Sequence, residues 1–332
     1  MPHERSSTVW EELLKTAVLT PSPHNTQPWR LRISDDRHAT LYMDRDRTLP
    51  DEDITGHFVR CAMGMFLESL RIISANSGMT LRYTLIDDDT AQPLIPFAAL
   101  ELEAGAEPSN YSNDLFHHRA TSRLGSNGKR IDSQLSALLK QFEPDYGHRY
   151  HQFDEASLIE EIIQENIRAV FHDLNVPAYH DEIARWFRYS DEEAKNKADG
   201  LDYRCMRTSA IELKLMKALP QIMRWPFFRT IMRRTYRRKL GDVSHIGIIC
   251  GPFFDNAASV RAGAFLMRFW LELARHKLHI HPFGNLVTNA KSKSRVQAMT
   301  GMNDAWLVFR IGYTDDPPRS YRRPVNKVIV HD

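Results

Sequence analysis

Two long apolar segments, residues 56–77 and 257–277, constrain the fold more than any other feature of the sequence. Apolar side chains recur almost continuously along both, as in buried helices. Both segments carry a similar tetrapeptide near their starts, Val59-Arg-Cys-Ala62 in one and Val260-Arg-Ala-Gly263 in the other. A strand pattern and a turn precede each segment, and another strand pattern follows it. This recurrence predicts an internal duplication, with chance similarity between two buried helices as the alternative.

The hydrophobic periodicity elsewhere predicts a mixed α+β chain. Helical spacing occurs in residues 8–19, 114–118, 132–142, 155–173 and 179–189. Strand patterns cover residues 29–33, 39–43, 80–86, 97–103, 149–153, 245–250 and 305–311. Gly, Pro, Ser and Asn are frequent between residues 105 and 113. Such a stretch predicts a boundary between a first half, residues 1–108, and a second half, residues 109–332.

The run Thr20-Pro-Ser-Pro-His-Asn-Thr-Gln-Pro-Trp29 lies at a predicted helix-to-strand junction. Its three prolines fix φ and bias the preceding residues towards extended geometry, so we expect a rigid, non-helical loop. One interpretation is that Ser22, Asn25 and Gln27 hydrogen-bond a flat ligand with polar edges while Trp29 anchors the loop in the core. The alternative is a connector whose polar groups satisfy only the backbone.

Length, composition and charge describe a globular protein. A chain of 332 residues with 42% hydrophobic residues can bury a large core. No apolar run approaches bilayer length, and the charged start lacks the apolar centre of a signal peptide, so we predict a cytoplasmic protein without stable membrane insertion. The cysteines, Cys61, Cys205 and Cys250, are too dispersed for a disulfide framework. Lys and Arg total 44 against 42 Asp and Glu, so we expect no nucleic-acid partner.

One segment departs from this even charge distribution. From Lys214 to Lys239 there are nine basic residues and no acidic one, interleaved with Met, Leu, Ile, Phe and Trp. A membrane-surface or nucleic-acid element is one interpretation. The other is an amphipathic helical cover whose cations attract an anionic ligand, and it is favoured because the apolar residues are too numerous to leave in water. We therefore expect residues 190–240 to form a helical lid.

The proline-rich run closely resembles the A-P-S-x-x-N-x-Q-P-W signature of the nitroreductase superfamily of flavin enzymes. In that superfamily the loop borders FMN across a dimer interface, and the other subunit supplies an R-x-[ST]-x-R phosphate segment. Arg119-Ala-Thr-Ser-Arg123 in the second half matches that segment. The chain thus resembles the fused, double-length Acg-like branch of the superfamily. The resemblance implies a duplicated nitroreductase-like fold of mostly antiparallel sheets and long helices, a pseudo-dimer with one complete flavin site.

The resemblance also implies which residues bind FMN. Guanidinium groups suit the phosphate because they form paired, charge-assisted hydrogen bonds with it. The tail Pro317-Pro-Arg-Ser-Tyr-Arg-Arg-Pro324 stands where the family places a second basic contribution, although a solvated basic tail is the alternative. The expected cofactor-binding residues are Ser22, Pro23, His24, Asn25, Gln27, Arg119, Thr121, Arg123, Arg319, Ser320 and Arg322, with Arg323 less firmly included.

The turn His281-Pro-Phe-Gly-Asn285 follows the second long segment, where the family places a P-x-x-G type turn at the flavin N5. Pro282, Phe283 and Gly284 are therefore the expected catalytic positions, through a main-chain N–H. This turn lacks the acidic residue that is commoner in the family. His276, His279 and His281 are nearby, but no Asp, Glu or Cys completes a ligand set, so we expect no metal site.

The sequence therefore predicts an FMN-dependent oxidoreductase that passes hydride from NAD(P)H to a small electron-poor acceptor, by a ping-pong route. Nitroaromatics and quinones are the acceptors that the resemblance implies. No G-x-G-x-x-G motif follows a strand, so the nicotinamide donor would stack on the flavin without a dinucleotide domain. A flavin-binding or sequestering protein with little turnover is the alternative. The chain would act as a monomeric pseudo-dimer or a homodimer.

Overall fold

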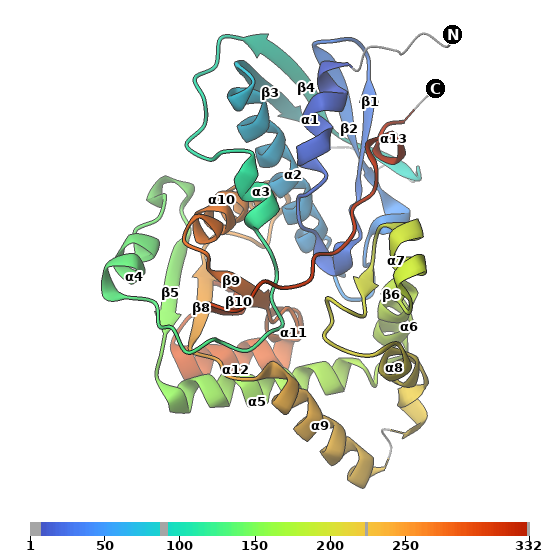
Figure 1. Ribbon diagram of the computed structural model, residues 1–332, viewed down its shortest axis with the longest axis vertical. Helices are drawn as coiled ribbons and strands as arrows, with labels where there is room; N and C mark the ends of the chain where they lie inside the picture. Colours follow the sequence, from blue (N-terminus) through green and yellow to red (C-terminus); the bar gives the residue numbers. More distant parts are fainter. Residues whose placement is uncertain (1–7, 87–91, 223–224, 331–332) are drawn as a thin grey trace.

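The computed structural model describes residues 8–86, 92–222 and 225–330, which form two α+β halves and a helical insertion (Figure 1). The first half contains α1 (Val9–Ala17), η1 (Pro23–Asn25), β1 (Trp29–Ile33), β2 (His38–Asp44), η2 (Arg45–Arg47), α2 (His57–Asn76), β3 (Met79–Leu85) and β4 (Leu94–Ala104). The connection to the second half contains α3 (Asp114–His118). None of these described helices, nor any in the rest of the described chain, is both long and apolar enough to cross a membrane.

The second half begins with α4 (Ser133–Lys140), η3 (Pro144–Tyr146) and β5 (Arg149–Phe153). An insertion follows, with α5 (Ala156–Asp173), α6 (Pro177–Trp186), β6 (Phe187–Arg188), α7 (Asp191–Lys197), β7 (Leu201–Asp202), α8 (Ala210–Ile222) and α9 (Pro226–Leu240). The half is completed by β8 (His245–Cys250), α10 (Asn256–Arg275), β9 (His279–Pro282), α11 (Asn285–Thr288), α12 (Ala290–Thr300), β10 (Ala305–Gly312) and α13 (Val325–Val328).

The two halves share one strand topology. Their sheets have the orders β1-β2-β4-β3 and β5-β8-β10-β9, and all the strand pairs within them are antiparallel. In each half a 20-residue helix connects the second and third strands along the chain. The predicted duplicated α+β fold is confirmed. The insertion lies between β5 and β8, so it is longer than the lid expected at residues 190–240.

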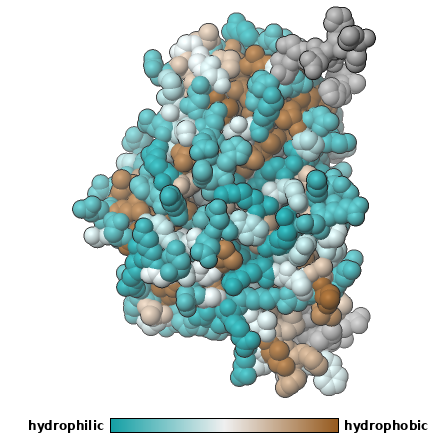
Figure 2. Space-filling view, viewed as in Figure 1, coloured by the Kyte–Doolittle hydropathy of each residue, from teal (hydrophilic) through white to brown (hydrophobic). Residues whose placement is uncertain are grey.

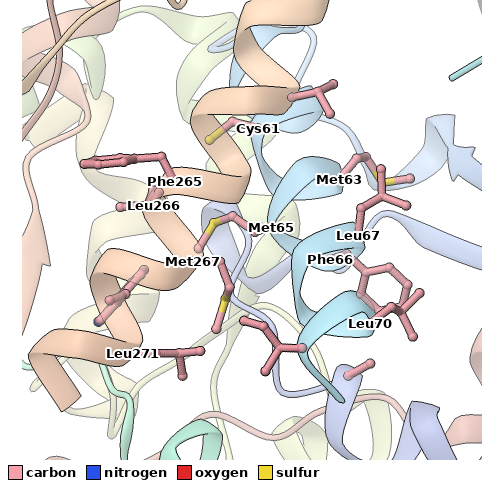
Figure 3. Close-up of a cluster of buried hydrophobic side chains, with 14 of the residues drawn as sticks. Cys61, Met63, Met65, Phe66, Leu67, Leu70, Phe265, Leu266, Met267 and Leu271 are labelled. Carbon is pink, nitrogen blue, oxygen red and sulfur yellow. The ribbon is translucent and has the colours of Figure 1, made fainter. Parts of the chain in front are cut away.

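The halves meet at the crossing of α2 and α10 (Figure 3). Gly64 and Gly263 are each the eighth residue of their helix. A Cβ atom on Gly64 would lie 2.1 Å from the Val260 carbonyl oxygen, and one on Gly263 would lie 2.1 Å from that of Cys61. The contacts are reciprocal, as at a twofold axis between identical subunits. They also give the register of the duplication: Val260 is equivalent to Cys61, so the Val-Arg similarity seen in the sequence is displaced by two residues.

Short-range interactions explain where several helices begin. The Thr8 hydroxyl accepts the Glu11 N–H while the Glu11 carboxylate accepts the Thr8 N–H, a capping box for α1. The Asp132 carboxylate accepts the Leu135 N–H and caps α4 as the sequence predicts, and Asp255 caps α10 in the same way. These caps orient the two short helices and the long helix against their sheets.

Two clusters of apolar side chains form the core. The larger one spans both halves, and the smaller one lies between the second sheet and α5, α11 and α12. Trp29 is fully buried in the larger cluster and stacks on Phe66 with ring centroids 4.7 Å apart, so it anchors the preceding loop as predicted. The chain returns to the first half after β10, because Ile329 pairs with Leu31 at the edge of the first sheet (Figure 1).

A buried histidine in the second half makes stability depend on pH. Burial lowers the pKa of His148 to about 4, and its Nδ1 accepts the Trp306 indole N–H at 3.3 Å. In the unfolded chain His148 binds a proton below a pH of about 6.5, whereas in the folded chain it stays neutral down to a pH of about 4. The free energy of unfolding should therefore fall by about 2–3 kcal/mol between pH 6.5 and 4. Denaturation of His148→Gln, which keeps an acceptor, should show a flatter pH dependence. His38→Gln, at an exposed histidine, is the control, and an unchanged slope in His148→Gln would refute the assignment.

Candidate functional site

A cavity of about 480 Å³ lies where the two halves and the insertion meet. Its volume is in the range typical of small-molecule and cofactor sites. All but one of the firmly predicted site residues line it: Ser22, Pro23, His24, Asn25, Arg119, Thr121, Arg123, Pro282, Phe283, Gly284, Arg319, Ser320 and Arg322. The fold thus brings Ser22 and Arg322, which are 300 residues apart in the sequence, to the same cavity.

The loop between α1 and β1 has a more specific backbone than expected. Ser22 is extended, as expected before a proline, but Gln27, which also precedes a proline, has φ of 52°, so the expectation was wrong there. His24 and Asn25 have φ of 48° and 55° within the short turn η1, which the expected non-helical loop did not include. Such left-handed geometry is unusual for residues other than glycine and is held here by hydrogen bonds. The Ser22 hydroxyl accepts the Gln27 N–H at 2.8 Å, and the Thr20 hydroxyl donates to the Ala17 carbonyl in the core.

Gln27 does not line the cavity. Its side chain is fully buried, donates to the Ala198 carbonyl at 2.8 Å and accepts the Arg323 N–H at 2.9 Å. The Arg323 guanidinium in turn donates to the Gln27 carbonyl at 3.2 Å. Both side chains already have protein partners, so they fasten the insertion and the tail to the loop, and the expected ligand contacts of Gln27 and Arg323 are not supported.

Three arginines gather on one cavity wall. The Arg119 guanidinium donates to the Leu19 carbonyl at 2.8 Å and lies over the Trp270 ring, 4.8 Å from its centroid. Arg322 donates to the Asn25 amide oxygen at 2.6 Å, and Arg319 donates to the Arg119 carbonyl at 3.1 Å. Within the described chain, no carboxylate lies within ion-pair distance of Arg119 or Arg322.

Burial makes this cluster a strong site for an anion. Desolvation, followed by repulsion from Arg322 and Arg319, holds the pKa of Arg119 well below its usual range. Burial likewise lowers the pKa of Arg322 to about 10. The Nε atoms of both side chains are buried without a hydrogen-bond partner in the described chain. An anionic group in the cavity would supply the missing acceptors and the missing charge, which fits a phosphate.

The opposite part of the loop carries a charge pair that sequence reasoning missed. His24 Nε2 lies 2.5 Å from a Glu52 carboxylate oxygen. Burial lowers the pKa of His24, but the charge and hydrogen bond of Glu52 outweigh it, so the net pKa is raised. Glu182 of α6 accepts the Asp51 and Glu52 N–H groups and holds this segment in place. Glu52 lies 28 residues from His24 in the sequence, and no motif connects the two.

The turn after β9 offers one free main-chain donor. Pro282 has no N–H, and the Phe283 N–H donates to the Val308 carbonyl at 2.8 Å within the sheet. Among Pro282, Phe283 and Gly284, only Gly284 therefore has an N–H that donates to no protein carbonyl in the described chain. Asp173 of α5 accepts the Asn285 and Asn289 side-chain amides at 2.7 and 3.0 Å. These hydrogen bonds attach the segment after the turn to α5, a role for Asp173 that the sequence did not indicate.

The histidines near this turn lie on a strand. His279 and His281 belong to β9, which the sequence analysis did not predict. His279 Nδ1 lies 3.0 Å from the Thr314 hydroxyl. His281 lines the cavity, its Nδ1 has no partner among the described residues, and burial holds its pKa well below the usual range. It adds a neutral imidazole to the site that sequence reasoning had considered only for a metal.

The insertion forms the remaining wall. Its contribution comprises Asn166, Val170, Asp173, Leu174, Ile183, Phe187, Gly200, Leu201, Asp202, Cys205, Met206, Met216 and Tyr236. The Gly200 N–H donates to the Asn25 carbonyl at 3.2 Å, which joins the insertion directly to the loop. Opposite, Leu266 and Trp270 of α10 and Met65 of α2 are apolar. The cavity thus combines an arginine-lined end with an apolar wall from α2 and α10.

Comparison with known proteins gives partial sequence matches. No family model matches the chain. Over 76 residues it is 36% identical to the "Putative NAD(P)H nitroreductase acg" of Mycobacterium tuberculosis, a match that covers 22% of this chain and 23% of that protein. It is 42% identical over 67 residues to the uncharacterized protein Rv3127 of the same organism, over 18% and 20% of the two chains. The chain thus matches less than a quarter of the length of these relatives.

Solved structures are more distant. The FMN-dependent nitroreductase NfnB of Mycobacterium smegmatis, solved in complex with NADPH, covers 62% of this chain and 92% of its own, with 12% identity and a TM-score of 0.39. A nitroreductase-like family protein from Bacillus cereus covers 66% and 95%, with 12% identity and a TM-score of 0.35. These scores are too low to support the fold, which rests on the repeated strand order. The sequence matches, however, confirm that this chain resembles the nitroreductase superfamily.

Proposed function

We propose that the protein is an FMN-dependent oxidoreductase of the nitroreductase type, which takes hydride from NAD(P)H and passes it to a small electron-poor acceptor such as a nitroaromatic or a quinone, by a ping-pong route. The observation that supports this most is the arginine cluster with two unpartnered buried Nε atoms among the described residues. A phosphate-bearing cofactor fits it in charge and in hydrogen bonding. FMN, when bound, would supply the hydride-accepting chemistry at N5.

The residues of the chain have distinct roles in this proposal. Arg119, Arg319 and Arg322 would hold the phosphate, and Thr121, Arg123 and Ser320 also line the cavity wall. Trp270 packs behind the Arg119 guanidinium and keeps it directed at the anion. Ser22, Pro23, His24 and Asn25 border the ring system. The Gly284 N–H would be available to the flavin N5, and the apolar side chains of α2 and α10 would exclude water from the interior.

A sequestering protein with little turnover is the second candidate, and the insertion favours it. Met216 and Tyr236 line the cavity, and the bond from the Gly200 N–H to Asn25 ties residues 198–206 across the loop. A cover held in this way controls the access of both donor and acceptor. The two candidates share the flavin site and differ only in whether bound flavin is reduced.

The duplication implies a second position, related to the cavity by the pseudo-twofold symmetry of α2 and α10, and this position should bind no flavin. In the helix register of the duplication, Trp270 on α10 corresponds to Arg71 on α2. Arg71 pairs with Glu68 at 2.9 Å, and Arg268 pairs with Glu68 at 3.2 Å and with Glu143 at 2.6 Å. We infer from this register that the ion-pair network lies at the position that the duplication makes equivalent to the cavity. We therefore propose one flavin site per chain, at the junction of residues 1–108 and 109–332.

An absorbance spectrum of the purified protein, followed by anaerobic addition of NADPH and NADH, tests the proposal. We expect a flavin spectrum that bleaches within seconds, and saturation at about one FMN per chain in a titration of the apoprotein. Oxidised flavin that persists would favour the sequestering protein. Failure to bind FMN after reconstitution would overturn the proposal, and two FMN per chain would contradict the account of the second position.

A further inference from the structure

The α8–α9 hairpin carries an unusual surface that the proposed flavin site does not use. Trp225, Phe227 and Phe228 are 67%, 70% and 48% exposed at its tip. Ile211 and Leu215 on α8 and Ile231 on α9 are further exposed apolar side chains of the hairpin. Figure 2 shows hydrophobic side chains at this end of the molecule, where Figure 1 places α8 and α9. The segment is helical and packs part of its apolar side chains, but the expectation that so many would not be left in water does not hold for these six.

The hairpin buries only its inner face. Met216, Met232 and Tyr236 pack against the smaller core cluster, and two of them reach the cavity wall. The outer face of α9 keeps aromatic side chains in its first turn exposed to water. Large apolar side chains gathered exposed on one element mark an interaction site.

Exposed basic side chains lie on the same two helices as these apolar side chains. Lys214, Lys217, Arg229, Arg234 and Arg238 are exposed, and the sequence from residue 214 to 239 contains no acidic residue. The acidic partners in contact with this segment lie outside it: Glu160 pairs with Arg237, and Glu212 pairs with Lys239. The exposed cations are thus available to an external anionic partner.

We propose that the α8–α9 hairpin docks the protein on the surface of an anionic lipid bilayer. Aromatic side chains beside Lys and Arg are the combination that binds the boundary between headgroups and acyl chains. A second copy of the chain is a poorer partner, because a symmetric contact would bring two basic faces together. Duplex nucleic acid would match the charge but would leave Trp225, Phe227 and Phe228 without an apolar environment. The docking is peripheral and requires no membrane-spanning helix.

Tryptophan fluorescence offers a direct test. Of the six tryptophans, Trp10, Trp29, Trp186, Trp270 and Trp306 are at most 6% exposed, so Trp225 is the one that a bilayer can reach. The full-length protein is mixed with vesicles of phosphatidylcholine, with and without about one third phosphatidylglycerol, at low and high salt. Brominated acyl chains should quench Trp225 only in the anionic vesicles, and the quenching should weaken with salt. Trp225→Phe should abolish the quenching while the protein still sediments with the vesicles.

Paired variants separate the apolar and basic contributions. Phe227→Ser with Phe228→Ser should lower vesicle binding at least about tenfold, whereas Ile54→Ser with Leu138→Ser, at exposed apolar positions elsewhere, should leave it unchanged. Arg229→Glu with Arg234→Glu should have a comparable effect, and Arg37→Glu should have little. Circular dichroism checks that each variant is folded.

Three results would overturn the proposal. One is the absence of anionic-vesicle binding at low salt by the folded protein. Another is displacement of the protein from vesicles by a mixed-sequence DNA duplex whose own binding to the protein does not change when Phe227 and Phe228 are replaced. The third is a concentration-dependent dimer in sedimentation that the same phenylalanine variants abolish, which would assign the patch to a second copy of the chain.

Discussion

Gly263→Ala is expected to destabilise the protein by at least about 3 kcal/mol, although the same change in an ordinary helix stabilises it by up to about 1 kcal/mol. The new Cβ atom would lie 2.1 Å from the Cys61 carbonyl oxygen and 2.8 Å from the Met65 amide nitrogen. Both are backbone atoms of α2, so no side-chain rotation relieves the overlap. The helices must separate, which loosens the packing of the larger core cluster on both sides of the crossing (Figure 3).

Chemical denaturation of Gly64→Ala, Gly263→Ala and the double variant measures this. Gly284→Ala is the control, because nothing lies within 4 Å of the position that its new methyl group would take, and its φ of −53° suits alanine. The double variant of Gly64 and Gly263 should lose less than the sum of the single losses, since one separation of the helices accommodates both methyl groups. Strict additivity, or a Gly263→Ala protein as stable as the control, would contradict the reciprocal contact.

Arg119→Met should lower FMN affinity about 10- to 100-fold and, at the same time, stabilise the apoprotein by about 1–3 kcal/mol. The arginine is buried and its Nε has no partner in the described chain, so in the apoprotein its charge is uncompensated. Methionine keeps the contact with Trp270 without the charge. FMN loses a charge-assisted hydrogen bond to its phosphate, which accounts for the weaker binding.

Two measurements on the same preparations check the expected loss of FMN affinity and the expected gain in apoprotein stability. Flavin titration gives the affinity, and thermal unfolding of the apoprotein gives the stability. Arg37→Met is the control, because Arg37 is 61% exposed and pairs with Glu101 far from the cavity. Equal flavin affinity in the two variants would exclude Arg119 from the phosphate site. Lower affinity with a destabilised apoprotein would instead point to a disrupted fold.

The sequence predicted the regular elements well because their signals are local. The strands at residues 29–33, 149–153 and 245–250 and the helix at 114–118 have the predicted bounds, and both long helices are within two residues at either end. Thirteen of the residues that line the cavity were also predicted, from the loop at residues 20–29, Arg119–Arg123, the tail at 317–324 and the turn at 281–285. The duplication was recognised from a tetrapeptide similarity, although its true register follows from Gly64 and Gly263.

The predictions failed where contacts between residues far apart in the sequence determine the structure. Gln27 belongs to the motif, but its partners Ala198 and Arg323 are 171 and 296 residues away, and nothing local indicates that they satisfy its amide. The strand β9 is only four residues long and includes a proline, so it has little periodicity to detect. The exposure of Phe227 could not be predicted either, because helical spacing reveals that a helix has an apolar face without revealing what covers it.

The repeated topology has a further consequence for how the protein can change. In a homodimer every substitution occurs in both subunits, so the two cofactor positions must remain alike. Within a single chain the two positions are encoded separately. Glu143 and Arg268 can therefore brace one side of the molecule with ion pairs while Arg119 and Trp270 serve the other. Under the proposed function, duplication within one chain would turn a symmetric pair of sites into one structural side and one chemical side, each open to alteration without the other.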